Sequence, residues 1–228
     1  MASRRLGWDW DPSEKYVLQA VQASRRRLKT DYIDLYQLHG GTIDDPADET
    51  VRAFERLLKD GVIRAWGISS IRPNVVRRYA AMAESGAARL SSEMVQYSVL
   101  DRRPEEEILE AARRAGISVL VRGAVAGGLL AGKPPAGKPP AGYLDLAASE
   151  VEAAQATLRA ISGSDNRMAQ TAIQFALSHP AVTAVAAGAS SVDQVDANVA
   201  AADGPLLGEA DQHALREAVQ QLRYTSHR

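Results

Sequence analysis

Hydrophobic positions along the chain repeat with two alternating periods. Residues 12–29 carry small or apolar side chains with the spacing of one buried helix face, and Asp11, Pro12 and Glu14 form a helix start with an N-cap acceptor, a proline at N1 and an acid at N3. The face comprises Val17, Ala20, Val21, Ser24 and Leu28. Residues 31–39 then have the β-branched, aromatic and leucine content of a strand buried on both faces.

The same succession of helix and strand recurs to the end of the chain. Further strands are expected at 62–70, 93–99, 117–125 and 182–189. Helices are expected after Pro46, Pro73 and Pro104, and at about 147–162, 165–178, 191–202 and 209–223. Gly61, Gly86 and Gly116 each stand between a helix and a strand, where we expect a left-handed helix stop. This order predicts an α/β protein with a parallel sheet of five strands in a single domain, residues 1–228.

The number of strands is small for a closed barrel. The five strand–helix units occupy about 190 residues, and an eight-unit (β/α)₈ barrel at this rate would need about 300. The pattern is therefore typical of a TIM-type (β/α)₈ barrel that lacks about three strands.

Composition excludes several classes of function. Lys and Arg total 27 against 28 for Asp and Glu, and their interspersion offers no surface for nucleic acid. The absence of cysteine excludes disulfides and thiolate sites. There is no signal-peptide pattern and no stretch able to span a bilayer, so we expect a cytoplasmic protein without membrane or nucleic-acid partners.

Candidate chemistry gathers where strands end, because active sites of parallel α/β folds lie at the carboxyl ends of the strands. These ends hold His39, Ser69 and Ser70, Gln96 and Tyr97, Arg122, and Gly188 to Ser191. Alternation places His39 on the same face as Ile33, Leu35 and Gln37. A lone histidine at this position also fits a structural role, in which it caps a loop or satisfies a buried hydrogen bond.

The segment GASSVDQVDAN, residues 188–198, predicts a helix start suited to a phosphate. Gln194 and Asn198 lie one turn apart on one face of that helix. An ordinary N-cap at Ser190 or Ser191 explains the hydroxyls equally well. Upstream, the unit AGKPP occurs twice, at 131–135 and 136–140, and predicts a loop with Lys133 and Lys138. Two interpretations of the repeat are open: its lysines contact a pyrophosphate, or it is a tolerated expansion of a surface loop.

Five ordered segments resemble the aldo-keto reductases, (β/α)₈ barrels that reduce carbonyls with NADPH. The segments are LKTDYIDLYQLH, LLKDGVIRAWGISS, MVQYSVLDR, VRGAVAGGLLAGK and GASSVDQVDAN, and the resemblance extends from about residue 8 to residue 223. It implies an oxidoreductase with a small carbonyl substrate and an NADPH cofactor. NADH is also possible, because no Lys or Arg occurs between Arg167 and Arg216 to bind the adenosine phosphate.

The resemblance also implies roles for individual residues. His39 matches the histidine that orients the substrate carbonyl. Ser69 and Gln96 match positions that hold the nicotinamide carboxamide, and Ser70 stands where many members have asparagine. Arg122 stands where some branches of the family have a tyrosine that stacks on the nicotinamide and other branches have arginine. The remaining matches lie at the cofactor phosphates and comprise Gly128, Leu130 and Lys133 near the pyrophosphate, and Gly188, Ser190, Ser191, Gln194 and Asn198 at the adenosine end.

The family's aspartate, tyrosine and lysine have no matching position in this chain, since they belong to three earlier strands. Tyr32 and Tyr36 alternate to the face opposite His39. A positioned general acid contributes about 10²- to 10⁴-fold in rate, so we expect weak or lost reductase activity. A non-catalytic NAD(P)H-binding regulatory or interaction subunit is the alternative. A metal-dependent hydrolase using His39 and Asp34 is disfavoured, because alternation separates the two side chains.

Three missing strands would also leave two edges of the sheet unpaired, which favours self-association. An open sheet, a closed oligomer and a fragment of a longer protein all fit this pattern, and we interpret the chain as a fragment.

Overall fold

The computed structural model describes residues 10–70, 72–132 and 142–227. Its centre is one sheet of parallel strands in the order of the chain. The strands are β1 (Ile33–His39), β2 (Ile63–Ser69), β3 (Leu90–Gln96), β4 (Ser118–Arg122) and β5 (Val182–Ala186). The predicted α/β class and the five parallel strands are thus confirmed.

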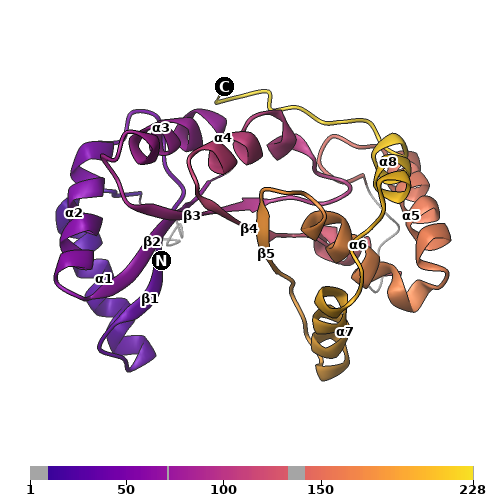
Figure 1. Cartoon of the computed structure of the whole chain (residues 1–228), viewed down its shortest axis with the longest axis horizontal. Helices are drawn as coiled ribbons and strands as arrows, with labels where there is room; N and C mark the ends of the chain where they lie inside the picture. The colour runs from indigo at the N-terminus through magenta and orange to yellow at the C-terminus, as the bar shows by residue number, and fades with distance from the viewer. Residues whose placement is uncertain (1–9, 71, 133–141, 228) are drawn as a thin grey trace, which may run out of the picture.

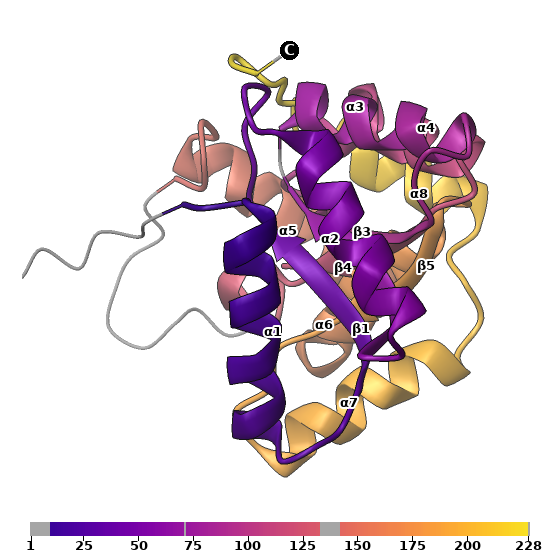
Figure 2. The same ribbon diagram turned by 90° about the vertical axis from the view of Figure 1, so that its left-hand side faces the viewer.

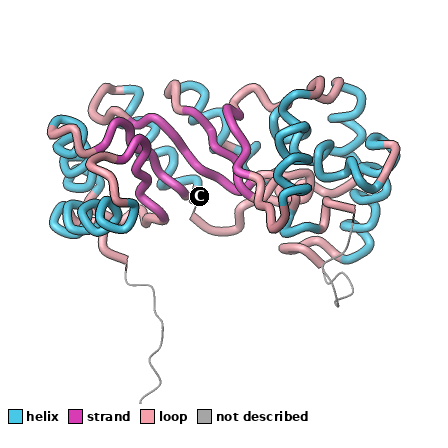
Figure 3. The backbone as a smooth tube through the Cα atoms, turned by 90° about the horizontal axis from the view of Figure 1, so that it is seen from below, coloured by secondary structure: helices cyan, strands magenta, loops and turns pink. Residues whose placement is uncertain are grey.

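Helices cover the convex side of this sheet (Figure 1). The α-helices are α1 (Glu14–Leu28), α2 (Ala47–Lys59), α3 (Pro73–Glu84), α4 (Ile108–Arg114), α5 (Ala148–Ser162), α6 (Met168–Leu177), α7 (Val192–Asp203) and α8 (Glu209–Glu217). Short 3₁₀ helices are η1 (Arg103–Glu106), η2 (Ala126–Gly128) and η3 (Asp165–Arg167). In the side view α1 and α2 flank β1, and from below the strands are visible between two groups of helices (Figures 2 and 3).

Helix stops follow the expected chemistry, whereas some boundaries differ from the prediction. Gly61, Gly86 and Gly116 have φ angles of 69°, 75° and 68°, as predicted for left-handed helix stops. The first helix is capped by Ser13, whose Oγ accepts a hydrogen bond from the Tyr16 N–H, and not by Asp11. Leu28 was wrongly assigned to the buried face, because the last turn of α1 exposes its side chain to solvent.

Two further boundaries are corrected. The third strand begins at Leu90, which pairs with Trp66, and ends at Gln96. It does not continue to residue 99, because Ser98 and Asp101 close a turn through reciprocal backbone hydrogen bonds. The last helix ends at Glu217, and the chain then runs without regular structure across α4 to α3 (Figure 1). There the Asn74 N–H donates to the His227 carbonyl oxygen.

The core between sheet and helices is organised by aromatic rings. Phe54 of α2 stacks on Trp66 of β2 with ring centroids 4.6 Å apart, and Trp66 meets Tyr79 of α3 edge-on at 6.2 Å. All three side chains are buried. On the opposite face of the sheet, a Cβ atom at Gly67 would collide with Ser92, so glycine allows β2 and β3 to approach closely.

Both ends of the sheet are edges within the described residues, since the sheet order places β1 and β5 last. Beside β5, an apolar groove lies between α6 and α7, and Val192, Val195 and Val199 of α7 are exposed. Self-association through these edges stays a prediction. None of the described helices is long and apolar enough to cross a membrane.

We expect the substitution Phe54→Ala to destabilise the protein by about 3–5 kcal/mol, because it removes a buried ring and leaves a cavity beside Trp66. Urea denaturation followed by tryptophan fluorescence measures the change. The control Val192→Ala alters an exposed side chain of α7 and should change the free energy of unfolding by less than about 0.5 kcal/mol. Equal effects of the two substitutions would contradict the assigned core.

Candidate active site

Two candidate residues end neighbouring strands side by side. His39 of β1 pairs in register with Ser69 of β2, and the Gly40 N–H donates to the Ser69 carbonyl oxygen at 2.9 Å. The His39 side chain is exposed and makes no hydrogen bond or ion pair with any residue in the described ranges. The imidazole is therefore accessible to a ligand at the end of the sheet.

The next two strands end on a hydrogen-bonded pair. Gln96 of β3 is in register with Arg122 of β4, and Arg122 Nη1 donates to Gln96 Oε1 at 2.8 Å. The other end of the same amide donates from Nε2 to Asp101 Oδ2 at 2.9 Å and to the Tyr143 hydroxyl oxygen at 3.1 Å. Gln96 therefore lies at the centre of a polar cluster.

Asp101, Arg103 and Tyr143 belong to this cluster although the sequence analysis did not select them. Arg103 forms a two-pronged ion pair with Asp101 through Nε at 2.8 Å and Nη2 at 2.9 Å. Burial, followed by the charge of Asp101, raises the pKa of Tyr143, so the phenol keeps its proton. For Asp101 and Arg103 the sequence signal was their position just beyond a strand end. Tyr143 follows the AGKPP repeat, and no periodic pattern indicates that it lies near Gln96.

Ser70 has a different environment from Ser69. Its hydroxyl accepts a hydrogen bond from the Arg72 N–H at 3.1 Å, and its own N–H donates to Glu93 Oε1 at 3.3 Å. The Glu93 side chain is fully buried, and Oε2 has no hydrogen-bond partner among the described residues. Burial raises the pKa of Glu93 well above its ordinary value, and the Ser70 N–H opposes this effect only in part. Burial therefore favours the protonated carboxyl group.

The candidate phosphate-contacting segments are separate. In η2, Gly128 adopts a φ of 97°, and the nearby Leu130 is fully buried, so this leucine anchors the segment in the core. Lys133 lies outside the described residues, as do Lys138 and most of the AGKPP repeat. Contact of these lysines with a pyrophosphate stays a prediction.

The start of α7 is held by its own side chains. Ser191 is the N-cap, and its Oγ accepts a hydrogen bond from the Gln194 N–H at 3.3 Å. Gln194 Oε1 accepts one from the Ser190 N–H at 2.7 Å, and Asn198 donates to the Gly188 carbonyl oxygen at 3.4 Å. The four polar residues therefore lie together. Their hydrogen bonds are those of an ordinary helix cap, which was the alternative to a phosphate site.

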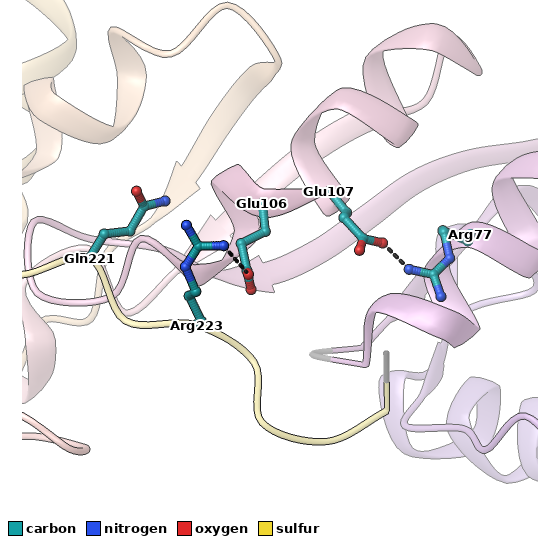
Figure 4. A pocket seen from close by; sticks show the side chains of 5 residues that line it. All are labelled: Arg77, Glu106, Glu107, Gln221 and Arg223. Atoms are coloured by element: carbon teal, nitrogen blue, oxygen red, sulfur yellow. Dashed lines mark hydrogen bonds and ion pairs between the residues drawn. The ribbon is translucent and has the colours of Figure 1, made fainter.

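Figure 4 shows a charged pocket of about 540 Å³, and none of its lining residues is a sequence-predicted site residue. It is lined by Arg77, Glu106, Glu107, Gln221 and Arg223. Arg77 pairs with Glu107, Arg223 pairs with Glu106 at 3.5 Å, and Glu106 also accepts a hydrogen bond from the Tyr224 N–H at 2.8 Å. The two contacts of Glu106 attach the C-terminal segment to η1, and the Arg77–Glu107 pair joins α3 to the start of α4.

Comparisons with known proteins identify the family. The aldo/keto reductase family model matches residues 4–219. The chain belongs to the aldo/keto reductase family. The family's (β/α)₈ barrel fold, present here as five parallel strands, was predicted correctly from the strand order and the five motifs.

Individual oxidoreductases are similar over the whole chain or over about half of it. It is 44% identical to the uncharacterized oxidoreductase YqkF of Bacillus subtilis over 226 residues, which cover 97% of this chain and 72% of that protein. The holo form of aldo-keto reductase AKR11C1 from Bacillus halodurans superposes with a TM-score of 0.85 at 46% identity, covering 100% of this chain and 72% of that one. The NADH-specific methylglyoxal reductase of Escherichia coli is 34% identical over 120 residues, 51% of this chain and 35% of that protein.

We expect Glu93→Gln to remove a pH dependence of stability. A buried carboxyl with a raised pKa stabilises the fold fully below the ordinary pKa of about 4.5, and this contribution is lost as the pH rises through the folded pKa. As the pH rises, the wild-type free energy of unfolding should therefore fall more steeply than that of the glutamine variant. The difference between the two slopes is at most about 1.4 kcal/mol per pH unit. Glutamine keeps an oxygen for the Ser70 N–H.

Urea denaturation from about pH 5 to about pH 8 measures this difference. The control Glu152→Gln changes an exposed glutamate of α5 and should follow the wild type. Parallel curves for the wild type and Glu93→Gln would show that the pKa of Glu93 in the folded protein is not raised into this range.

Proposed function

We propose that this aldo/keto reductase binds NAD(P)H across the carboxyl ends of β1 to β4 and directs hydride toward a small aldehyde or ketone. The main support is the arrangement of His39, Ser69, Gln96 and Arg122 on four consecutive strand ends, with two of the pairs in register. Ser69 and Gln96 offer hydrogen bonds to the nicotinamide carboxamide. Arg122, half-buried beside Gln96, offers a planar cationic group for the ring.

His39 is the residue proposed to orient the substrate carbonyl. Its exposed imidazole can donate a hydrogen bond to a carbonyl oxygen. Nothing in the described chain holds that imidazole in one orientation, which favours slow turnover. The same observation supports the second candidate function, a subunit that binds NAD(P)H without turnover.

NADPH is proposed as the cofactor, with NADH as the alternative. The loop with Gly128, Leu130 and Lys133, and the start of α7 with Gly188, Ser190, Ser191, Gln194 and Asn198, are the proposed phosphate contacts. The start of α7 combines backbone N–H groups with hydroxyl and amide side chains, which suit a phosphate. The absence of Lys and Arg between Arg167 and Arg216, and the similarity to an NADH-specific reductase, support NADH.

We expect the protein to change the fluorescence of NADPH or NADH on titration, with saturation below millimolar concentration. Arg122→Leu should weaken this binding about tenfold or more, because it removes a charged partner of Gln96. Arg113→Leu on the surface of α4 is the matched control and should leave the affinity unchanged. The absence of any protein-dependent change up to millimolar cofactor would overturn the cofactor proposal.

We expect aldehyde reduction to be weak and to depend on His39. No position matches the family's acid and its partners, so the rate should lie about 10²- to 10⁴-fold below that of a site with a positioned acid. Absorbance at the wavelength of the reduced nicotinamide measures turnover of wild type, His39→Gln and the control His213→Gln, an exposed residue of α8. Cofactor binding without turnover would favour the non-catalytic subunit, and turnover unaffected by His39→Gln would exclude the proposed role of His39.

A further inference from the structure

The Gln96 side-chain amide is enclosed by groups of opposite polarity. Arg122 donates to its oxygen, and Asp101 accepts from its nitrogen. The Tyr143 hydroxyl oxygen is the second acceptor for that nitrogen. The two hydrogens on Nε2 are thus both in use, and Oε1 keeps one lone pair for a further donor.

These neighbours determine the orientation of the amide. A rotation by half a turn would direct Gln96 Oε1 at the Asp101 carboxylate and the amide NH₂ at the Arg122 guanidinium. Each hydrogen bond would be replaced by a contact between like polarities, in a half-buried place where such contacts are poorly screened. Gln96 therefore presents its oxygen toward Arg122 and its nitrogen toward Asp101.

Asp101 is itself fixed in place. Its side chain is buried, and Arg103 holds both of its carboxylate oxygens. The Asp101 N–H donates to Ser98 Oγ at 3.1 Å, within the turn that follows β3. Arg103 in turn lies over the ring of Tyr224, 5.1 Å from its centroid. The acceptor for Gln96 is thus held by a charge pair and a turn.

Tyr143 is presented to Gln96 by a tight turn. The Tyr143 N–H donates to the Leu146 carbonyl oxygen at 3.1 Å, and the Leu146 N–H donates to the Tyr143 carbonyl oxygen at 3.0 Å. Leu146 is buried, whereas Leu144 has a φ of 55°, which is unfavourable for a leucine. Such strain persists where surrounding contacts enforce it, so the turn is a defined support for the tyrosine.

We propose that Asp101 and Tyr143 are positioning residues that restrict Gln96 to the role of hydrogen-bond acceptor for the NH₂ group of the nicotinamide carboxamide. This inference rests on the proposed function, in which Gln96 contacts the nicotinamide. It makes the site selective for a ring substituent that carries an N–H donor. An acetyl group has the same carbonyl oxygen but a methyl in place of the NH₂, so it leaves Oε1 without that partner.

The test compares three ligands by calorimetric titration: NADP⁺, its 3-acetylpyridine analogue, and 2′-phospho-ADP-ribose, which has no nicotinamide. If the wild type prefers NADH, the corresponding ligands without the 2′-phosphate replace them. The wild type should bind the carboxamide about 2- to 10-fold more tightly than the acetyl analogue, the range of one hydrogen bond. The affinity for 2′-phospho-ADP-ribose measures what the rest of the site contributes to binding.

Two variants reduce this selectivity. Asp101→Asn lets the amide take either orientation, and Tyr143→Phe frees one Nε2 hydrogen while keeping the ring. Both should bring the ratio of the two nicotinamide affinities toward one and leave the 2′-phospho-ADP-ribose affinity unchanged. The controls Asp34→Asn, at the exposed pair with Arg64, and Tyr16→Phe, on the surface of α1, should keep the wild-type ratio.

Each outcome of this experiment decides the matter. A wild type that binds both nicotinamide ligands equally, a ratio that both variants retain, or an equal loss of affinity for all three ligands would overturn the positioning role. If Asp101→Asn does not fold, as judged by circular dichroism, Tyr143→Phe decides alone. A wild type that binds 2′-phospho-ADP-ribose but gains nothing from the nicotinamide would overturn the inference, whereas no binding of any ligand would overturn the proposed function itself.

Discussion

The candidate site depends on the register of the parallel hydrogen-bond ladder. Because β1 pairs with β2 and β3 with β4 in parallel, the last residues of each pair emerge next to each other, as His39 does beside Ser69 and Gln96 beside Arg122. A shift by one residue would turn these side chains to the helix layer. The aromatic core around Trp66 opposes such a shift, since Trp66 would leave its place between Phe54 and Tyr79. Packing on the helix side therefore maintains the chemistry at the end of the sheet.

The half-buried Gln96 and the fully buried Glu93 illustrate different solutions to the cost of desolvation. Gln96 is neutral and has partners of both charges, so its orientation is determined without a net charge of its own. Glu93 has one backbone donor and an oxygen without a described partner, and burial raises its pKa. The first arrangement favours a single geometry, whereas the second responds to pH. Both residues belong to β3, on opposite faces of the strand.

Periodic features were predicted from the sequence, and features that depend on loop paths were not. The strands, the glycine stops and the residues at strand ends follow from patterns of two to four residues, which local sequence carries. Asp101, Arg103 and Tyr143 reach Gln96 through the Ser98 turn and the turn at Leu144, whose courses are set by tertiary contacts. Leu28 has a core-like spacing, yet its side chain is exposed, because the spacing does not show which turns of a helix another element covers. The contact of Arg103 with the Tyr224 ring joins two residues that are too far apart along the chain for any local pattern to indicate it.

The turn that carries Tyr143 closes on itself through its two backbone hydrogen bonds, and the buried Leu146 fixes it to the core. On the other side of the repeat, Leu130 is equally buried. Both anchors are described residues, and the AGKPP repeat lies between them in the sequence. The acceptor that Tyr143 offers to the Gln96 nitrogen at 3.1 Å is therefore supported by a turn whose own hydrogen bonds and buried leucine all come after the repeat in the chain.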